Sequence, residues 1–136
     1  MLLANMAKSD ATKRILTIQR KYGAVSGLSS SAMAMDQLMD CFVKGAEGSY
    51  NKDANFDYLS YFFADIAKHQ EGRKYLLTEQ TYDSVVPISK LVVFTEHSSL
   101  VRRKGVASTI KYVVLPHTIP TIPYHATSTD ITIHPN

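Results

Sequence analysis

A six-residue pattern occurs three times along the chain, and its spacing constrains the fold more than any other feature. The segments are LANMAK (residues 3–8), FADIAK (63–68) and VASTIK (106–111), each with Ala second, Lys last and mostly apolar residues elsewhere. The second and third segments are 43 residues apart, and armadillo and HEAT repeats have periods of about 40–47 residues. The larger gap before the second segment is explained by an inserted polar loop over residues 45–57. The spacing predicts an all-α, armadillo-like helical solenoid of about two to three repeats.

The stretch 58–77 contains the clearest helical pattern. Its apolar residues recur at i, i+3, i+4, i+7 and i+8 and therefore share one face of a helix: Leu59, Phe62, Phe63, Ile66 and Ala67. Polar and aromatic residues fall on the opposite side of the same helix: Tyr61, Asp65 and Lys68. We expect Gly72 to break this helix and a second helix to begin at residue 73.

Two helices are predicted before this stretch. Ser9 or Asp10 can cap a helix over residues 11–20. A second, amphipathic helix covers residues 32–44, and Gly45 suits its C-terminal end. The apolar stripe of that second helix consists of Ala32, Met35, Leu38, Met39, Phe42 and Val43.

Two helices are also predicted after it. The first, over residues 87–96, has Pro in its first turn and is apolar nearly all round, which predicts burial on several sides. The last helix follows Ser98 or Ser99, either of which can cap it. Arg103 falls on its apolar stripe, so either the helix starts after Arg103 or the stem of this side chain lies along apolar surface. Residues 71–115 therefore match the three-helix arrangement of an armadillo repeat rather than the two-helix HEAT arrangement.

The chain divides into a helical part and a tail. Residues 1–115 carry the helical repeats, whereas residues 116–136 contain four prolines that a helix cannot accommodate, so we expect an extended or disordered tail. The net charge of +3 on 136 residues is too small for a nucleic-acid-binding face. With Cys41 as the single cysteine, no internal disulfide can form, and we expect a reducing, cytoplasmic location. No segment is apolar enough for a signal peptide or a membrane span.

The sequence offers little support for catalysis or metal binding. Four alternating residues resemble the start of a calcium loop: Asn51, Asp53, Asn55 and Asp57. The resemblance fails because Phe56 and Phe62 occupy the positions that need Gly and a bidentate Glu. Three tail histidines are too widely and unequally spaced to indicate a zinc site: His117, His125 and His134. With no phosphate loop and no nucleophile elbow either, we expect neither an enzyme nor a cofactor.

A solenoid usually binds other proteins through its concave face. Asn5, Asp65 and Ser108 occupy equivalent positions in the three hexamers and could form a ladder along that face. Tyr61 and Lys68 complete the candidate partner-binding groove. The alternative interpretation is that each of these residues is an ordinary solvent-facing position on an amphipathic helix.

The chain also resembles a known family. Its segments LLANMAKSD, LSSSAMAMDQLMDCFVKGAEGSYNK, FDYLSYFFADIAKHQEGRKYLL, YDSVVPISKLVVFTEH and VRRKGVASTIK closely resemble the middle of the eukaryotic HGH armadillo-like proteins. The resemblance covers residues 1–111 and includes the inserted loop. It implies a cytosolic chaperone that assists the folding of translation elongation factor 2 together with the cytosolic chaperonin, with no cofactor, nucleic acid or membrane involved.

Two departures from the family lead to further expectations. Family members begin with additional repeats and continue past the third hexamer, whereas here the sequence from Tyr112 onward matches nothing in the family. We therefore expect a truncated central fragment whose uncapped ends expose apolar surface and favour self-association. The alternatives to a folding chaperone are a passive adaptor that docks a linear peptide of a folded partner, or an inactive truncated product.

Overall fold

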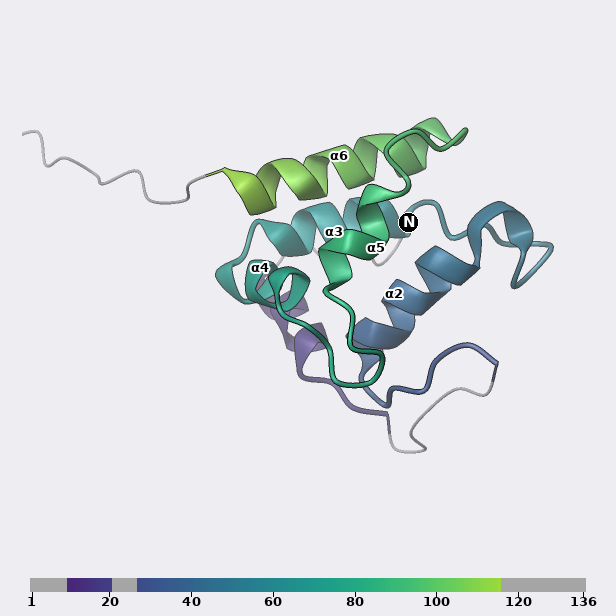
Figure 1. Cartoon of the computed structure of the whole chain (residues 1–136). Helices are drawn as coiled ribbons and strands as arrows, with labels where there is room; N and C mark the ends of the chain where they lie inside the picture. The colour runs from purple at the N-terminus through teal and green to yellow at the C-terminus, as the bar shows by residue number, and fades with distance from the viewer. Residues whose placement is uncertain (1–9, 21–26, 116–136) are drawn as a thin grey trace, which may run out of the picture.

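A computed structural model describes residues 10–20 and 27–115 of the chain (Figure 1). Within these ranges the chain is helical and contains no strand, which confirms the all-α prediction for this part. There are two short 3-10 helices, η1 (Asp10–Leu16) and η2 (Ala46–Gly48). The five α-helices are α2 (Ala34–Lys44), α3 (Leu59–Ala67), α4 (Gln70–Leu77), α5 (Pro87–Val92) and α6 (Leu100–Val114).

Helix α3 lies at the centre of the structure, with α6 alongside it and α2, α4 and α5 around it (Figure 1). The predicted apolar stripe of α3 is buried along its whole length, so the periodicity correctly identified the core-facing side. Phe42 from α2 packs edge-on against Phe63 of α3, with ring centroids 5.4 Å apart, and against Phe94 after α5, at 5.1 Å. These aromatic contacts join three segments of the fold. Burying one such side chain contributes roughly 1.5–3 kcal/mol to stability.

The predicted break at Gly72 is wrong. Helix α3 ends at Ala67, and α4 begins at Gln70, so the chain turns at residues 68–69 and Gly72 lies inside α4. A Cβ atom at Gly72 would lie 2.0 Å from the carbonyl oxygen of Ile66. Glycine is therefore present because the first turns of α4 approach the end of α3 closely, and not because it ends a helix.

The N-terminal part also differs from its prediction. The helix expected over residues 11–20 is a seven-residue 3-10 helix, η1, and the chain after it is extended. Gln19 forms an isolated antiparallel bridge with Met33, which holds Met33 extended, so α2 begins at Ala34 rather than at residue 32. Ser9, one of the two proposed caps, lies outside the described residues.

Helices α5 and α6 confirm two predictions and correct two others. Pro87 occupies the first turn of α5, and Ser99 caps α6 by accepting a hydrogen bond from the backbone N–H of Arg102. However, α5 ends at Val92 and continues only as turns. It is not buried on several sides, because Val92 and Val93 are 47% and 72% exposed. Since α6 already includes Arg103, the helix does not start after this residue, whose guanidinium instead donates to the carbonyl oxygens of His97 and Ser98.

Among the residues that the structure describes, no helix has the length and hydropathy needed to cross a lipid bilayer.

Candidate functional site

The candidate groove depends on how α3 and α6 pack against each other. A Cβ atom at Gly105 of α6 would lie 2.2 Å from Oγ of Ser60 on α3, so the two helices approach closely only because residue 105 is glycine. The Ser60 hydroxyl lies 3.0 Å from the carbonyl oxygen of Val101 and 2.7 Å from that of Asp57. It can therefore satisfy a backbone carbonyl at the crossing point, where both helices are buried.

This packing places the second and third hexamers on adjacent helices. Residues 63–68 run from α3 into the following turn, and residues 106–111 lie in α6 (Figure 1). Of the three equivalent positions, Asp65 and Ser108 therefore belong to adjacent helices. Asn5 and the first hexamer lie outside the described residues.

Asp65 is not a free polar group on a solvent-facing side. Its carboxylate accepts a hydrogen bond from Nζ of Lys68, and the residue is only 8% exposed. The hydrogen bond to Asp65 raises the pKa of the Lys68 ammonium above its usual value, and partial burial opposes this effect. Lys68 Nζ also lies 5.5 Å from the ring centroid of Tyr112 on α6. We conclude that Asp65 positions Lys68 at the junction of α3 and α6 and is less available to a partner than expected.

The other predicted groove residues remain accessible. Tyr61 is half-buried on α3, and its ring centroid lies 6.2 Å from that of Tyr58, which is exposed one turn earlier. Ser108 is half-buried on α6. We define the α3–α6 surface by the accessible residues of this region: Tyr58, Tyr61, Lys68, Ser108 and Tyr112. Three of its five residues are tyrosines, a residue type that is enriched in protein-binding surfaces, and it also carries a hydroxyl and an ammonium group.

Tyr58 and Tyr112 were not among the predicted site residues, although helical spacing contained a signal for both. Tyr58 precedes Tyr61 by three residues and Tyr112 follows Ser108 by four, so each lies on the same helix face as a predicted residue.

A buried arginine fixes the start of α6 and the inserted loop. Arg102 is fully buried, and its guanidinium donates to Oδ1 of Asp57 at 2.9 Å and to the carbonyl oxygens of Phe42 and Asn55 at 2.7 and 2.8 Å. Burial lowers the pKa of Arg102, and the bond to Asp57 opposes this shift. The guanidinium also lies between two rings, 3.8 Å from the centroid of Phe42 and 4.7 Å from that of Phe94. The end of the inserted loop is therefore held in the core by charge-assisted hydrogen bonds.

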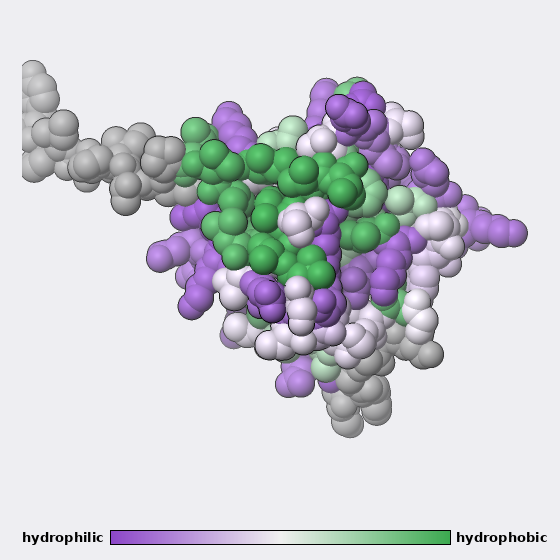
Figure 2. All heavy atoms as spheres, in the orientation of Figure 1, coloured by the Kyte–Doolittle hydropathy of each residue, from purple (hydrophilic) through white to green (hydrophobic). Residues whose placement is uncertain are grey.

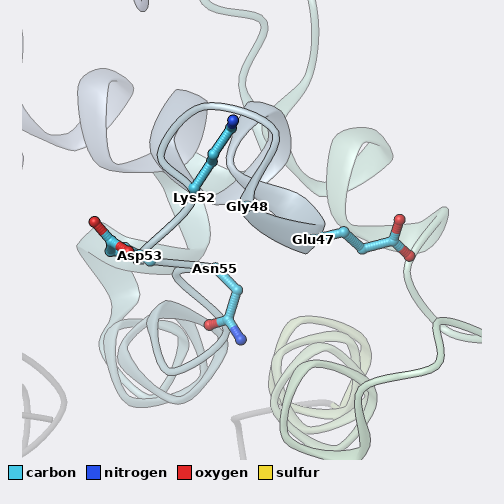
Figure 3. A pocket seen from close by; sticks show the side chains of 6 residues that line it. Glu47, Gly48, Lys52, Asp53 and Asn55 are labelled. Atoms are coloured by element: carbon cyan, nitrogen blue, oxygen red, sulfur yellow. The ribbon is translucent and has the colours of Figure 1, made fainter.

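The calcium-like residues of this loop have structural roles. Oδ1 of Asn51 accepts from the N–H of Asp53, and Oδ1 of Asn55 accepts from the N–H of Asp57. A polar hollow of about 360 Å³ lies beside them, lined by Glu47, Gly48, Lys52, Asp53, Ala54 and Asn55. The labelled side chains diverge instead of converging on one point, and Glu47 points away from the others (Figure 3). Within residues 10–20 and 27–115, no three His, Cys, Asp or Glu side chains are grouped closely enough to hold a metal ion.

A second buried polar network joins α2 to α4 and to the segment that follows α4. The hydroxyl of Tyr75 donates to Asp36 at 2.8 Å, and that of Tyr82 donates to Asp40 at 3.3 Å. Burial, and then the neighbouring aspartates, raise the pKa of both tyrosines. Lys90 donates to the Tyr82 oxygen at 2.8 Å and forms an ion pair with Asp83. Asp36 and Asp40 are both buried, and through them the network ties α2 to α4 and to the segment after it.

Comparison with known proteins identifies relatives of the chain. Residues 1–120 match the sequence profile of a family described as a domain of unknown function, DUF383. The chain is 51% identical over 113 residues to "Protein HGH1 homolog" of the fission yeast Schizosaccharomyces pombe. That alignment covers 83% of this chain and 31% of the yeast protein, so the chain spans less than a third of the length of this relative.

Proposed function

The chain belongs to the HGH family, which carries the DUF383 domain, and on this basis we propose that it is a protein-binding helical-repeat chaperone. In this proposal it assists the folding of translation elongation factor 2 together with the cytosolic chaperonin, in the cytoplasm, without catalysis and without a cofactor. Because the chain corresponds to 31% of the yeast relative, it contributes one section of a longer binding surface.

The observation that carries the proposal is the packing of α6 against α3. In an armadillo solenoid the last helices of successive repeats lie next to each other, and together they line the concave face. Here the two helices that contain matching hexamers are neighbours and approach closely at Ser60 and Gly105. We propose that the α3–α6 surface is this concave section and that it contacts exposed segments of an incompletely folded client.

The side chains of the α3–α6 surface suit such a client. Tyrosine presents a large apolar ring and a hydroxyl at a low entropic cost, and Lys68 adds a positive charge that Asp65 orients. Tyr58 and Lys68 lie ten residues apart, about 15 Å along a helix, which allows contact with several residues of an extended chain.

The test compares binding to unfolded and folded elongation factor 2. Purified factor is diluted from denaturant into buffer with the 136-residue chain, and capture by the chain is measured next to capture of the native factor. We expect preferential capture of the unfolded factor and, with chaperonin present, an increased yield of native factor. Equal binding of the native factor, without any gain in folding yield, would contradict the chaperone function and support the passive adaptor.

Variants locate the binding surface. Tyr61→Ala and Lys68→Ala should weaken client capture without lowering the melting temperature by more than a few degrees, because neither side chain is in the apolar core. Lys74→Ala is the matched control, since Lys74 is exposed on α4 and lies outside the α3–α6 surface. If all three variants capture client as the wild type does, Tyr61 and Lys68 are not part of the binding site.

A further inference from the structure

The end of the structure formed by α5 and α6 has a face that no other described element covers. Figure 2 shows a continuous apolar area over α6 and the neighbouring α5. The large apolar side chains that these elements expose are Val92, Val93, Leu100, Val114 and Leu115, of which Val93 and Val114 are more than 70% exposed. We call these five residues the α5–α6 face. An exposed apolar area of this size often marks a binding site, and along α6 it is interrupted by Lys104 and Lys111.

The charges beside the α5–α6 face all have one sign along α6. Exposed positions of α6 recur with helical spacing and alternate apolar with basic residues: Leu100, Lys104, Ala107, Lys111 and Val114. Neither α5 nor α6 contains an acidic residue, and the one acid between them, Glu96, lies in the turn that connects them. Within the described residues, Lys104 and Lys111 form no ion pair, in contrast to Lys90, which binds Asp83.

The exposed apolar side chains and the neighbouring lysines together indicate the chemistry of the partner. A two-fold pair of this chain would bring the lysines of one α6 close to those of the other, and such like-charge contacts oppose association. A helix with an apolar stripe and acidic residues along its edges would bury the three valines and two leucines of the face and neutralise Lys104 and Lys111. We propose that the α5–α6 face binds an amphipathic, acid-edged helix of a separate protein, as a second contact region distinct from the α3–α6 surface.

The proposal predicts a defined ligand preference. The probe is a fluorescently labelled helical peptide of about 18 residues with leucines along one stripe and glutamates on both edges, long enough to be partly helical. A second peptide keeps the leucine stripe and replaces the glutamates by lysines. We expect the 136-residue chain to bind the acidic peptide at least about tenfold more tightly, and binding to weaken when salt is raised from ~50 to ~300 mM.

Surface variants test whether the acidic peptide binds at the α5–α6 face. Val93→Asp should weaken acidic-peptide binding by about tenfold or more, and the double variant Lys104→Glu/Lys111→Glu should reverse the preference between the two peptides. Ile18→Asp is the control, because Ile18 is 47% exposed but follows η1, which packs on α2 and α4 rather than on α5 or α6. Circular dichroism checks that each variant is folded. We expect all of them to fold, because the substituted side chains are exposed.

Two results would overturn the proposal. If both peptides bind equally, or if Val93→Asp has no larger effect than Ile18→Asp, the face does not recognise an acidic helix. If sedimentation equilibrium instead shows a dimer that strengthens with salt and disappears in Val93→Asp, the occupant is a second copy of the chain. Because neither readout involves elongation factor 2, failure here leaves the proposed chaperone function standing.

Discussion

Nε of Arg102 lies 2.9 Å from Oδ1 of Asp57, and this contact joins the first turn of α6 to a residue 45 positions earlier in the chain. The same guanidinium satisfies two backbone carbonyl groups, one at the end of α2 and one in the inserted loop. One side chain therefore fixes the relative positions of α2, the loop and α6.

Replacing Arg102 with Ala should destabilise the protein strongly. The substitution leaves Asp57 as a buried carboxylate without a counter-charge and removes the donors to two carbonyl groups, and breaking a buried pair in this way costs about 3–5 kcal/mol. Urea denaturation should show this loss in the free energy of unfolding. Lys104→Ala is the control, since Lys104 is exposed on the same helix and its removal should change stability by less than about 0.5 kcal/mol. Similar stabilities for the two variants would show that the Arg102 network contributes little.

The Arg102 network also shows where sequence-based prediction ends. The apolar stripes of α2 and α3 were predictable because hydrophobic periodicity is a local property of the chain. Arg102 lies in a basic run, and nothing in the local sequence distinguishes it from Arg103, which is half-buried, or from Lys104, which is exposed. Its burial depends on Asp57, on the ring of Phe42 in α2 and on the ring of Phe94 after α5, and only the folded structure brings these together.

For the candidate site, helical patterns in the sequence indicate helix faces but not the burial of individual side chains. Residues 63–67 and 106–111 lie in the neighbouring helices α3 and α6, where Tyr61 and Ser108 are half-buried, and Lys68 is exposed in the turn after α3. The burial of Asp65 was not predictable, because it depends on tertiary packing that a local helical pattern does not contain. The exposure of Val92 and Val93 was missed for a related reason: an apolar sequence indicates a tendency toward burial and not the presence of a covering element.

Gly105→Ala should separate α6 from α3. The added Cβ would lie 2.2–2.5 Å from atoms of Ser60, including its backbone carbonyl carbon, so rotation of the serine side chain cannot relieve the clash. Overpacking of this kind costs about 1–3 kcal/mol, although alanine favours helix formation more than glycine does. We expect a lower melting temperature together with weaker client capture. Ser108→Ala, on the same helix, should leave the melting temperature nearly unchanged. An equal or higher melting temperature for Gly105→Ala would show that the helices have room to move apart.

Ser99→Ala should weaken the start of α6. Oγ of Ser99 accepts a hydrogen bond from the N–H of Arg102 at 3.3 Å, and loss of such a cap costs about 0.5–2 kcal/mol. Hydrogen exchange should show faster exchange of the Arg102 amide, with little change near the end of α6. Ser98→Ala provides the comparison, because Ser98 precedes the cap position and its side chain is not the capping group. If Ser98→Ala has the larger effect, the cap is assigned to the wrong serine.

High pH should destabilise the protein through Tyr75 and Tyr82. Both tyrosines have a pKa above the ordinary value of 10.0 in the folded state, chiefly because they are buried and next to Asp36 and Asp40. Well below pH 10 both tyrosines are protonated in the folded and the unfolded state, and their contribution to stability is complete. As the pH rises above 10, the unfolded chain loses these protons while the folded protein retains them, so the free energy of unfolding falls. Urea midpoints measured from pH 8 to ~11.5 should therefore decrease with pH.

The double variant Tyr75→Phe/Tyr82→Phe should be less stable near pH 8, because it loses hydrogen bonds to both aspartates, but should show a shallower decrease at high pH. Equal slopes for the wild type and this variant would mean that other groups cause the alkaline loss.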